Sequence, residues 1–160
     1  MRELSSSADP TATTVVNSPW GPLRAWYSDA GLHALYFYDV CLPKRWTPPP
    51  QAQEVSAPWG WAELVARARL APPGTPWQRR VWSALLQTTP GVVLSYGELA
   101  ARMGCPSSVR AVASAVASNP IGVLIPCHRI VPAKGGVGQY RWGSSLKADL
   151  IAYERSAGAL

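Results

Sequence analysis

A cysteine, a histidine and an arginine stand side by side at Cys127, His128 and Arg129, directly after Pro126 and inside an apolar run. Thiolate is the most nucleophilic common side chain near neutral pH, so Cys127 is a candidate for covalent chemistry. The apolar residues on both sides predict a buried strand, in which polar groups need hydrogen-bond partners or a chemical role. A buried structural cysteine explains the stretch equally well, because free cysteine packs like a small hydrophobic residue.

A partner for His128 is available near the end of the chain. Leu146, Leu150 and Ile151 mark the apolar face of a predicted helix, and Glu154 follows Leu150 by four residues, on the same face. A carboxylate on an apolar face needs a partner, so we expect Glu154 to orient His128. Spacing alone leaves open that Glu154 frays at the helix end.

The positive charge lies in the half of the chain that contains Cys127. The net charge is +6, but residues 1–74 carry six basic and six acidic side chains, whereas residues 75–160 carry nine and three. A basic half-chain favours a polyanionic partner, with nucleic acid as the leading candidate. A merely basic, soluble surface remains the alternative.

The three cysteines are Cys41, Cys105 and Cys127. This sparse, odd set argues against a disulfide framework and for a reducing compartment, and no clustered Cys/His spacing predicts a metal site. No apolar run is long enough for a membrane span, and the N-terminus lacks the apolar core of a secretory signal. We therefore expect a cytoplasmic protein, without metal or membrane attachment.

The first half predicts a small α/β domain over residues 15–72, after a flexible N-terminus at residues 1–14. Residues 23–27 and 32–38 read as an antiparallel strand pair, in which we expect His33 to be partly exposed and without a role. A Pro-rich linker over residues 43–58 and a helix over residues 61–70 follow.

The second half, residues 73–160, predicts four helices, near 76–88, 96–103, 109–117 and 144–155. Thr75 and Ser95 have the spacing of N-caps, and Ser108 is expected to cap the third helix. The second and third helices fit a helix-turn-helix. The third offers Arg110 and otherwise small side chains, which favours close approach to a narrow DNA groove; an Ala-rich packing helix explains that composition equally well.

Several motifs together resemble the O6-alkylguanine-DNA alkyltransferases, the methylated-DNA–protein-cysteine methyltransferases. Those of residues 75–155 occur in family order: Trp77–Trp82, Ser95–Ala100, Arg110–Ala113, Asn119-Pro120, Ile125–Arg129, Gly138–Tyr140, Lys147 and Glu154. Residues 18–23 and 31–32 add a weaker N-terminal match. The resemblance implies a ribonuclease H-like α/β domain, followed by a mainly α, winged-helix-like DNA-binding domain with a helix-turn-helix.

The family implies repair of DNA by direct reversal. The alkyl group of O6-alkylguanine, and that of O4-alkylthymine, would pass irreversibly to Cys127, once per molecule and without a cofactor. By resemblance, His128 and Glu154 would draw off the thiol proton through a water, and Tyr96 would donate to the purine. Lys147 would support the local field, and Asn119 would hold the turn against the Cys127 segment.

The resemblance also implies how DNA binds. A monomer would hold double-stranded DNA through the minor groove with the lesion flipped out, and Arg110 would occupy the vacated space. The further residues that the resemblance assigns to DNA are Gln78, Tyr96, Gly97, Ser108 and Ala111. Tyr140, Arg141, Trp142 and Pro126 would line the substrate pocket.

This chain departs from many relatives in the bulk of Arg141 and Trp142, so we expect a pocket that takes methyl readily and benzyl-sized groups poorly. A non-catalytic alkyltransferase-like lesion-binding protein is one alternative, although such proteins lack the cysteine that Cys127 supplies. A helix-turn-helix regulator with a structural cysteine is the other.

Overall fold

The computed structural model describes residue 4 and residues 9–37, 52–56 and 59–157. It divides into two compact units, one within residues 2–73 together with Pro120–Gly122, the other covering residues 74–119 and 123–160. The sequence predicted a boundary between residues 72 and 73, with Pro120–Gly122 in the second domain. Cys41 and most of the Pro-rich segment at 43–58 lie outside the described residues.

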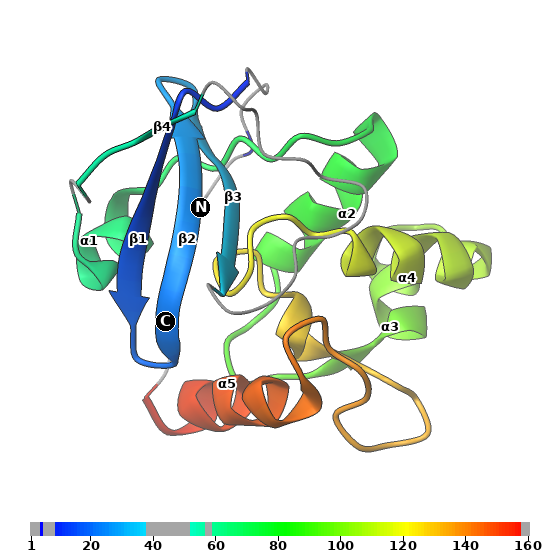
Figure 1. The fold of residues 1–160 in the computed structure, drawn as a ribbon. Coiled ribbons are helices and arrows are strands. Elements are labelled where there is room, and N and C mark those ends of the chain that lie inside the picture. Colours follow the sequence, from blue (N-terminus) through cyan, green and yellow to red (C-terminus); the bar gives the residue numbers. More distant parts are fainter. Residues whose placement is uncertain (1–3, 5–8, 38–51, 57–58, 158–160) are drawn as a thin grey trace. The chain divides into compact units, whose positions relative to one another are not determined.

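The first unit is built on a four-stranded sheet. Strands β1 (Ala12–Ser18), β2 (Gly21–Ser28) and β3 (Gly31–Phe37) are antiparallel neighbours, and the short β4 (Gln53–Glu54) pairs in parallel with β1. Figure 1 shows the three long strands side by side. The turn into β3 requires glycine, because Gly31 has a φ of 134° and a Cβ there would lie 2.4 Å from the carbonyl oxygen of Arg69.

Two expectations for this unit are wrong in detail. The flexible N-terminus was expected to reach residue 14, but β1 begins at Ala12, and Thr13 and Thr14 are buried. The sheet is mixed rather than antiparallel, because the parallel partner β4 comes from the Pro-rich segment, which has no strand pattern in its sequence.

His33 is also placed differently from the prediction. Its side chain is fully buried, with Nε2 2.8 Å from the hydroxyl of Ser28. The next strand residues, Ala34 to Phe37, are buried as well, because the segment at Pro120–Gly122 pairs with Leu35. Strand alternation therefore could not predict an exposed face here. Helix α1 (Trp61–Arg67), with Leu64 buried, contacts β1 (Figure 1).

The second unit contains four α-helices among its described residues. They are α2 (Pro76–Leu86), α3 (Tyr96–Arg102), α4 (Val109–Ala117) and α5 (Ser144–Ala157). Thr75 with Gln78 and Ser95 with Glu98 form complete capping boxes, which confirms both predicted helix starts. A short parallel pair joins β5 (Leu94–Ser95) to β6 (Ile130–Val131).

Helix α4 is attached to α2 by polar as well as apolar contacts. The indole nitrogens of Trp77 and Trp82 donate to the carbonyl oxygens of Ala111 (3.3 Å) and Ala115 (2.9 Å). Trp82 is 1% exposed, so its bond lies in the core, where an unpaired indole N–H would be costly. These contacts hold α4 in place while Arg110 and Ala111, near its start, stay exposed.

Helices α3 and α4 form the expected helix-turn-helix. Gly104, with a φ of 73°, ends α3, and a single 3₁₀ turn at Pro106–Ser108 leads into α4. Ser108 makes no side-chain capping bond, contrary to the prediction, because that preceding turn takes the place of a separate cap.

The prediction of a strand around Cys127 is also wrong. Cys127–Arg129 form a 3₁₀ turn, and only Ile130–Val131 continue as strand β6. Pro126 has no N–H for a strand ladder, and the Cys127 N–H donates 2.7 Å to the carbonyl oxygen of Ile125, which turns the chain. The prediction of burial holds, because Ile125, Cys127 and His128 are all buried.

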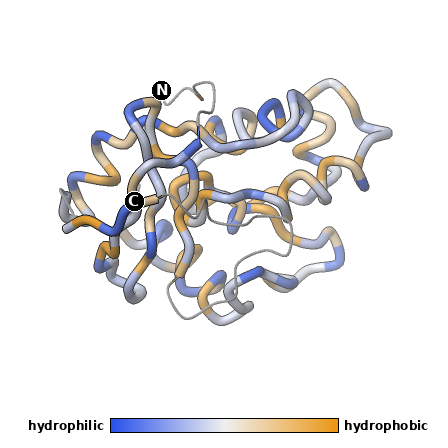
Figure 2. The backbone as a smooth tube through the Cα atoms, turned by 45° about the horizontal axis from the view of Figure 1, so that its top comes forward, coloured by the Kyte–Doolittle hydropathy of each residue, from blue (hydrophilic) through white to orange (hydrophobic). Residues whose placement is uncertain are grey.

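Among the described residues, no helix has the length and apolar character needed to cross a bilayer. In Figure 2 the hydrophobic runs are short and interrupted by hydrophilic residues.

Candidate active site

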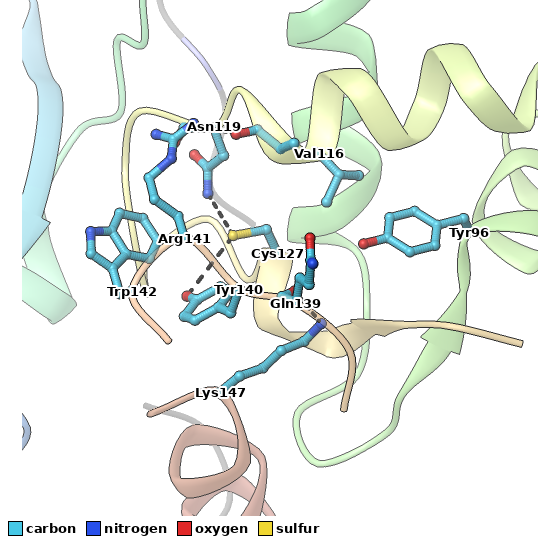
Figure 3. A pocket seen from close by; sticks show the side chains of 10 residues that line it. Tyr96, Val116, Asn119, Cys127, Gln139, Tyr140, Arg141, Trp142 and Lys147 are labelled. Carbon is cyan, nitrogen blue, oxygen red and sulfur yellow. Dashed lines mark hydrogen bonds between the residues drawn. The ribbon is translucent and has the colours of Figure 1, made fainter. Parts of the chain in front are cut away.

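Cys127 lines a pocket in the second unit. The cavity measures about 380 Å³ and is bordered by residues from α3, α4, the Cys127 turn, the segment before α5, and α5 itself. Its lining residues are Tyr96, Val116, Ala117, Asn119, Cys127, Gln139, Tyr140, Arg141, Trp142 and Lys147. Figure 3 shows the sulfur of Cys127 among these side chains.

Asn119 holds the thiol from the segment that follows α4. It is 1% exposed, and its Nδ2 donates to the carbonyl oxygen of Ile125 (2.9 Å) and to Sγ of Cys127 (3.1 Å). The Tyr140 hydroxyl lies 4.0 Å from Sγ on another side (Figure 3). Burial raises the pKa of the Cys127 thiol, while these contacts and the charges of Arg141 and Lys147 lower it.

His128 and Glu154 meet as predicted. The His128 Nε2 lies 2.9 Å from Oε1 of Glu154, and both side chains are fully buried. With Nε2–H donating to the carboxylate, a neutral ring leaves Nδ1 as a proton acceptor. Nδ1 has no hydrogen-bond partner among the described residues. Burial lowers the pKa of His128, although Glu154 opposes this, so the ring is neutral and able to accept a proton at neutral pH.

Arg129 is a second partner of Glu154. Its Nε and NH2 groups donate to both carboxylate oxygens, at 2.7 to 3.2 Å, and its NH1 group donates to the carbonyl oxygen of Thr88 (2.6 Å). The Gly91 N–H adds a bond of 2.9 Å to Oε2. Burial raises the pKa of Glu154, but the bonds from His128, Arg129 and Gly91 outweigh it and bring the pKa down to about 2.

Lys147 and Tyr96 bring a cation and a donor to the pocket. Lys147 is 1% exposed and donates from Nζ to the carbonyl oxygen of Ile130 (2.6 Å), with Nζ 5.9 Å from the ring centre of Tyr140. Burial raises the pKa of Tyr96, and a charged Cys127 raises it further, so the phenol keeps its proton as a donor.

The predicted pocket wall is largely present. Tyr140, Arg141 and Trp142 line the cavity, whereas Pro126 is buried but is not among the lining residues. Three lining residues were missed: Val116, Ala117 and Gln139. Gln139 is next to Tyr140 in sequence, and the expected position of Asn119 against the Cys127 segment was the signal that could have included Val116 and Ala117 at the end of α4.

The residues expected to bind DNA lie on or near the helix-turn-helix. Arg110 is exposed, and within the described part of the chain it has no charged or hydrogen-bonded partner. Gly97 and Ser108 lie at the starts of α3 and α4. Gln78 is already engaged: its Oε1 accepts from the Thr75 N–H, and its Nε2 donates to the Ser118 hydroxyl (3.0 Å).

The site's chemistry is that of a buried nucleophile. A thiol faces a cavity that is also lined by two phenols and two cations, and a neutral histidine oriented by a carboxylate is next to it in sequence. Such groups can ionise a thiol and stabilise a negatively charged leaving group. Across the described ranges, no cluster of His, Cys, Asp and Glu is suited to a metal ion.

The chain resembles known proteins along most of its length. The family described as "6-O-methylguanine DNA methyltransferase, DNA binding domain" matches residues 76–156. The methylated-DNA–protein-cysteine methyltransferase of Mycobacterium tuberculosis (H37Rv) is 34% identical over 149 residues, 88% of this chain and 90% of that protein. The crystal structure of Mycobacterium tuberculosis OGT in complex with DNA has a TM-score of 0.73 and 30% identity, and it covers 92% of this chain and 95% of that one.

Other relatives match about half of the chain, and the chain spans less than half of their own length. The "Bifunctional transcriptional activator/DNA repair enzyme Ada" of Escherichia coli K12 is 48% identical over 81 residues, 51% of this chain and 23% of that protein. The Kluyveromyces lactis methylated-DNA–protein-cysteine methyltransferase is 43% identical over 83 residues, 44% of its length. The α/β unit followed by a helical DNA-binding unit is the fold expected from the sequence. The chain belongs to the O6-methylguanine DNA methyltransferase family, the methylated-DNA–protein-cysteine methyltransferases of DNA repair.

Proposed function

We propose that this chain repairs O6-methylguanine in double-stranded DNA by moving the methyl group irreversibly to Cys127. The observation that carries the proposal is a buried thiol that faces a cavity of about 380 Å³ lined by hydrogen-bond donors. O4-alkylthymine presents the same kind of alkyl–oxygen bond and is a second substrate of this class. The thioether product is stable, so each molecule acts once.

The transfer is a displacement at the methyl carbon. Sγ of Cys127 forms a bond to that carbon as its bond to guanine O6 breaks, and the electron pair passes to the purine. His128 receives the thiol proton through a water at Nδ1, with Glu154 fixing the ring from Nε2. Tyr96 donates a hydrogen bond to the leaving purine, which takes up a proton from solvent while His128 holds the thiol proton, and Lys147 stabilises the negative charge as it develops.

We propose that α4 enters the minor groove and that the damaged base is flipped into the pocket. A base inside the stack cannot reach a buried thiol, so flipping is required. Arg110, exposed on the first turn of α4, takes the vacated space. Gly97, Ser108 and Ala111 let the backbone approach DNA, and Gln78, at the start of α2, contributes by exchanging its bond to Ser118 for one to a phosphate.

We assign its action to the bacterial cytoplasm, at the nucleoid, as a monomer. The substrate is chromosomal DNA, and the acceptor must remain a free thiol, which a reducing compartment preserves. A complex of one molecule per lesion, measured by light scattering with a short duplex, is the expected stoichiometry.

Mass spectrometry tests the proposal directly. After incubation with a duplex containing O6-methylguanine, the protein should gain the mass of one methylene group, located on the peptide with Cys127. An undamaged duplex of the same sequence is the control. A protein that binds the damaged duplex and never gains mass would contradict the proposal and support a non-catalytic lesion-binding protein.

Measuring affinity for different DNA sequences distinguishes the proposed repair function from that of a helix-turn-helix regulator. The proposed function requires similar affinity for unrelated undamaged duplexes, weakening as salt rises because the contacts are to phosphates. Strong preference for one undamaged sequence, together with no methyl acceptance, would support the regulator instead.

The bulky pocket wall predicts selectivity for small alkyl groups. We expect O6-benzylguanine to inactivate the protein much more slowly than methylated DNA does, because Arg141 and Trp142 occupy the wall of the cavity, and Trp142 is only 8% exposed. Residual activity after timed incubation measures the rate. Equal rates for the two substrates would contradict the prediction, and Trp142→Ala should increase the benzyl rate selectively.

Arg110→Ala should slow repair of duplex DNA by about tenfold to a hundredfold, because unstacking a base costs a few kcal/mol and Arg110 is proposed to fill the space it leaves. Single-turnover rates with duplex and single-stranded O6-methylguanine DNA measure the effect, and the single-stranded rate should change far less. Arg67→Ala, at an exposed pair with Glu63, is the matched control. Equal slowing on both substrates would contradict a role in flipping.

A further inference from the structure

We propose that Arg141 is a positioning residue for the transfer, which ties the pocket wall to the end of α4 and holds a positive charge beside the Cys127 thiol. The proposal rests on the proposed function, because it takes Cys127 as the acceptor. It goes beyond that function by giving a role other than steric bulk to a side chain of the pocket wall.

The guanidinium of Arg141 binds two main-chain carbonyl groups, one in the last residue of α4 and one in the segment that follows it. Its NH1 group donates to the carbonyl oxygen of Asn119 (3.1 Å), and its NH2 group donates to that of Ala117. The last carbonyl groups of a helix have no partner within the helix and carry its negative end, so a cation there is favourable. Arg141 thereby joins the segment before α5 to the helix proposed to enter DNA.

A single residue, Asn119, connects Arg141 to the Cys127 thiol. Arg141 holds the main chain of Asn119, and the Asn119 side chain donates to Sγ of Cys127 at 3.1 Å. On its other side, the guanidinium carbon lies 5.7 Å from the ring centre of Trp142, whose ring packs edge-on against Tyr140. Figure 3 shows Arg141 and Asn119 next to each other on one side of the sulfur.

The charge of Arg141 acts on a thiol that burial makes hard to ionise. Burial raises the pKa of Cys127, and the nearby positive charges of Arg141 and Lys147 lower it. The titratable and charged groups around the thiol are Tyr96 from α3, His128 and Arg129 from its own turn, Tyr140 and Arg141 from the pocket wall, and Lys147 and Glu154 from α5. Glu154 is neutralised by Arg129, which leaves Arg141 and Lys147 as the cations that line the cavity.

The experiment measures the reactivity of Cys127 without DNA. The full chain is treated with iodoacetamide over a series of pH values, and peptide mass spectrometry gives the rate at Cys127 alone. The variants are Arg141→Met and Arg141→Gln, which remove the charge, and Arg141→Lys, which keeps it. Lys134→Met removes an exposed charge outside the pocket lining and is the matched control.

We expect both neutral variants to raise the midpoint of the pH profile by about one unit or more and to lower the rate at neutral pH about tenfold. Arg141→Lys and Lys134→Met should keep the wild-type midpoint. A purely structural brace would lower thermal stability without moving the midpoint, so unchanged midpoints in both neutral variants would overturn the proposal. A shift in Lys134→Met as large as that in Arg141→Met would overturn it as well.

Failure of this proposal is distinguishable from failure of the proposed function. The iodoacetamide reaction needs neither DNA nor a flipped base, so Arg141 can be tested in a protein that accepts no methyl group. A wild type that repairs DNA while its Arg141 variants show unchanged profiles would leave the repair function standing.

Discussion

Cys127→Ser is expected to abolish methyl transfer, with no mass gain after prolonged incubation with O6-methylguanine DNA. A serine hydroxyl stays protonated at neutral pH, and the groups around it can ionise a thiol but not an alcohol. The substitution is nearly isosteric, and Asn119 Nδ2 can still donate to the oxygen. DNA binding should therefore survive while the chemistry is lost.

Cys105→Ser is the matched control for the loss of a thiol. Cys105 is a partly exposed free cysteine in the turn between α3 and α4, and it does not line the pocket. The expected result is wild-type methyl transfer. Mass gain in Cys127→Ser, or its loss in Cys105→Ser, would mean that another side chain is the acceptor.

Glu154→Gln is expected to lower the free energy of unfolding by about 3–5 kcal/mol, because it leaves the Arg129 guanidinium buried beside a neutral amide. The Arg129 side chain is 8% exposed and that of Glu154 is fully buried, so water does not replace the lost charge. Activity should fall as well, since His128 loses the carboxylate that orients its ring. Urea unfolding followed by circular dichroism gives the change in stability.

The same carboxylate predicts how wild-type stability depends on pH. Its hydrogen bonds bring the pKa of Glu154 from 4.5 down to about 2 in the folded protein. The stabilisation is fully present above pH 4.5 and is lost as the pH falls toward about 2. The difference in stability between wild type and Glu154→Gln should therefore shrink over that range.

Glu63→Gln is the control, because Glu63 pairs with Arg67 on an exposed face of α1, with side chains 43% and 78% exposed. A solvated pair four residues apart contributes less than about 0.5 kcal/mol, so this change should have almost no effect. A loss in Glu154→Gln no larger than that in Glu63→Gln would contradict the assigned role of the buried pair.

Several features of this protein could be predicted from its sequence, because they depend on residues close together in the chain. Thr75 with Gln78 and Ser95 with Glu98 predict helix starts because a capping box needs only residues three apart. Gly31 adopts the positive φ that the turn before β3 requires, a conformation that favours glycine. The pairing of His128 with Glu154 followed from helix periodicity and from His128 being the only histidine in its half.

The remaining features depend on residues far apart in the chain. Sequence alone predicted a candidate nucleophile with its histidine and carboxylate, and it indicated the helix-turn-helix and the family. Only the tertiary structure decided that Arg129 shares the carboxylate, that Asn119 donates to the thiol, and that Arg141 holds the end of α4. Hydrogen-bond partners of buried polar groups are chosen by which segments fold against them, and no local pattern encodes that choice.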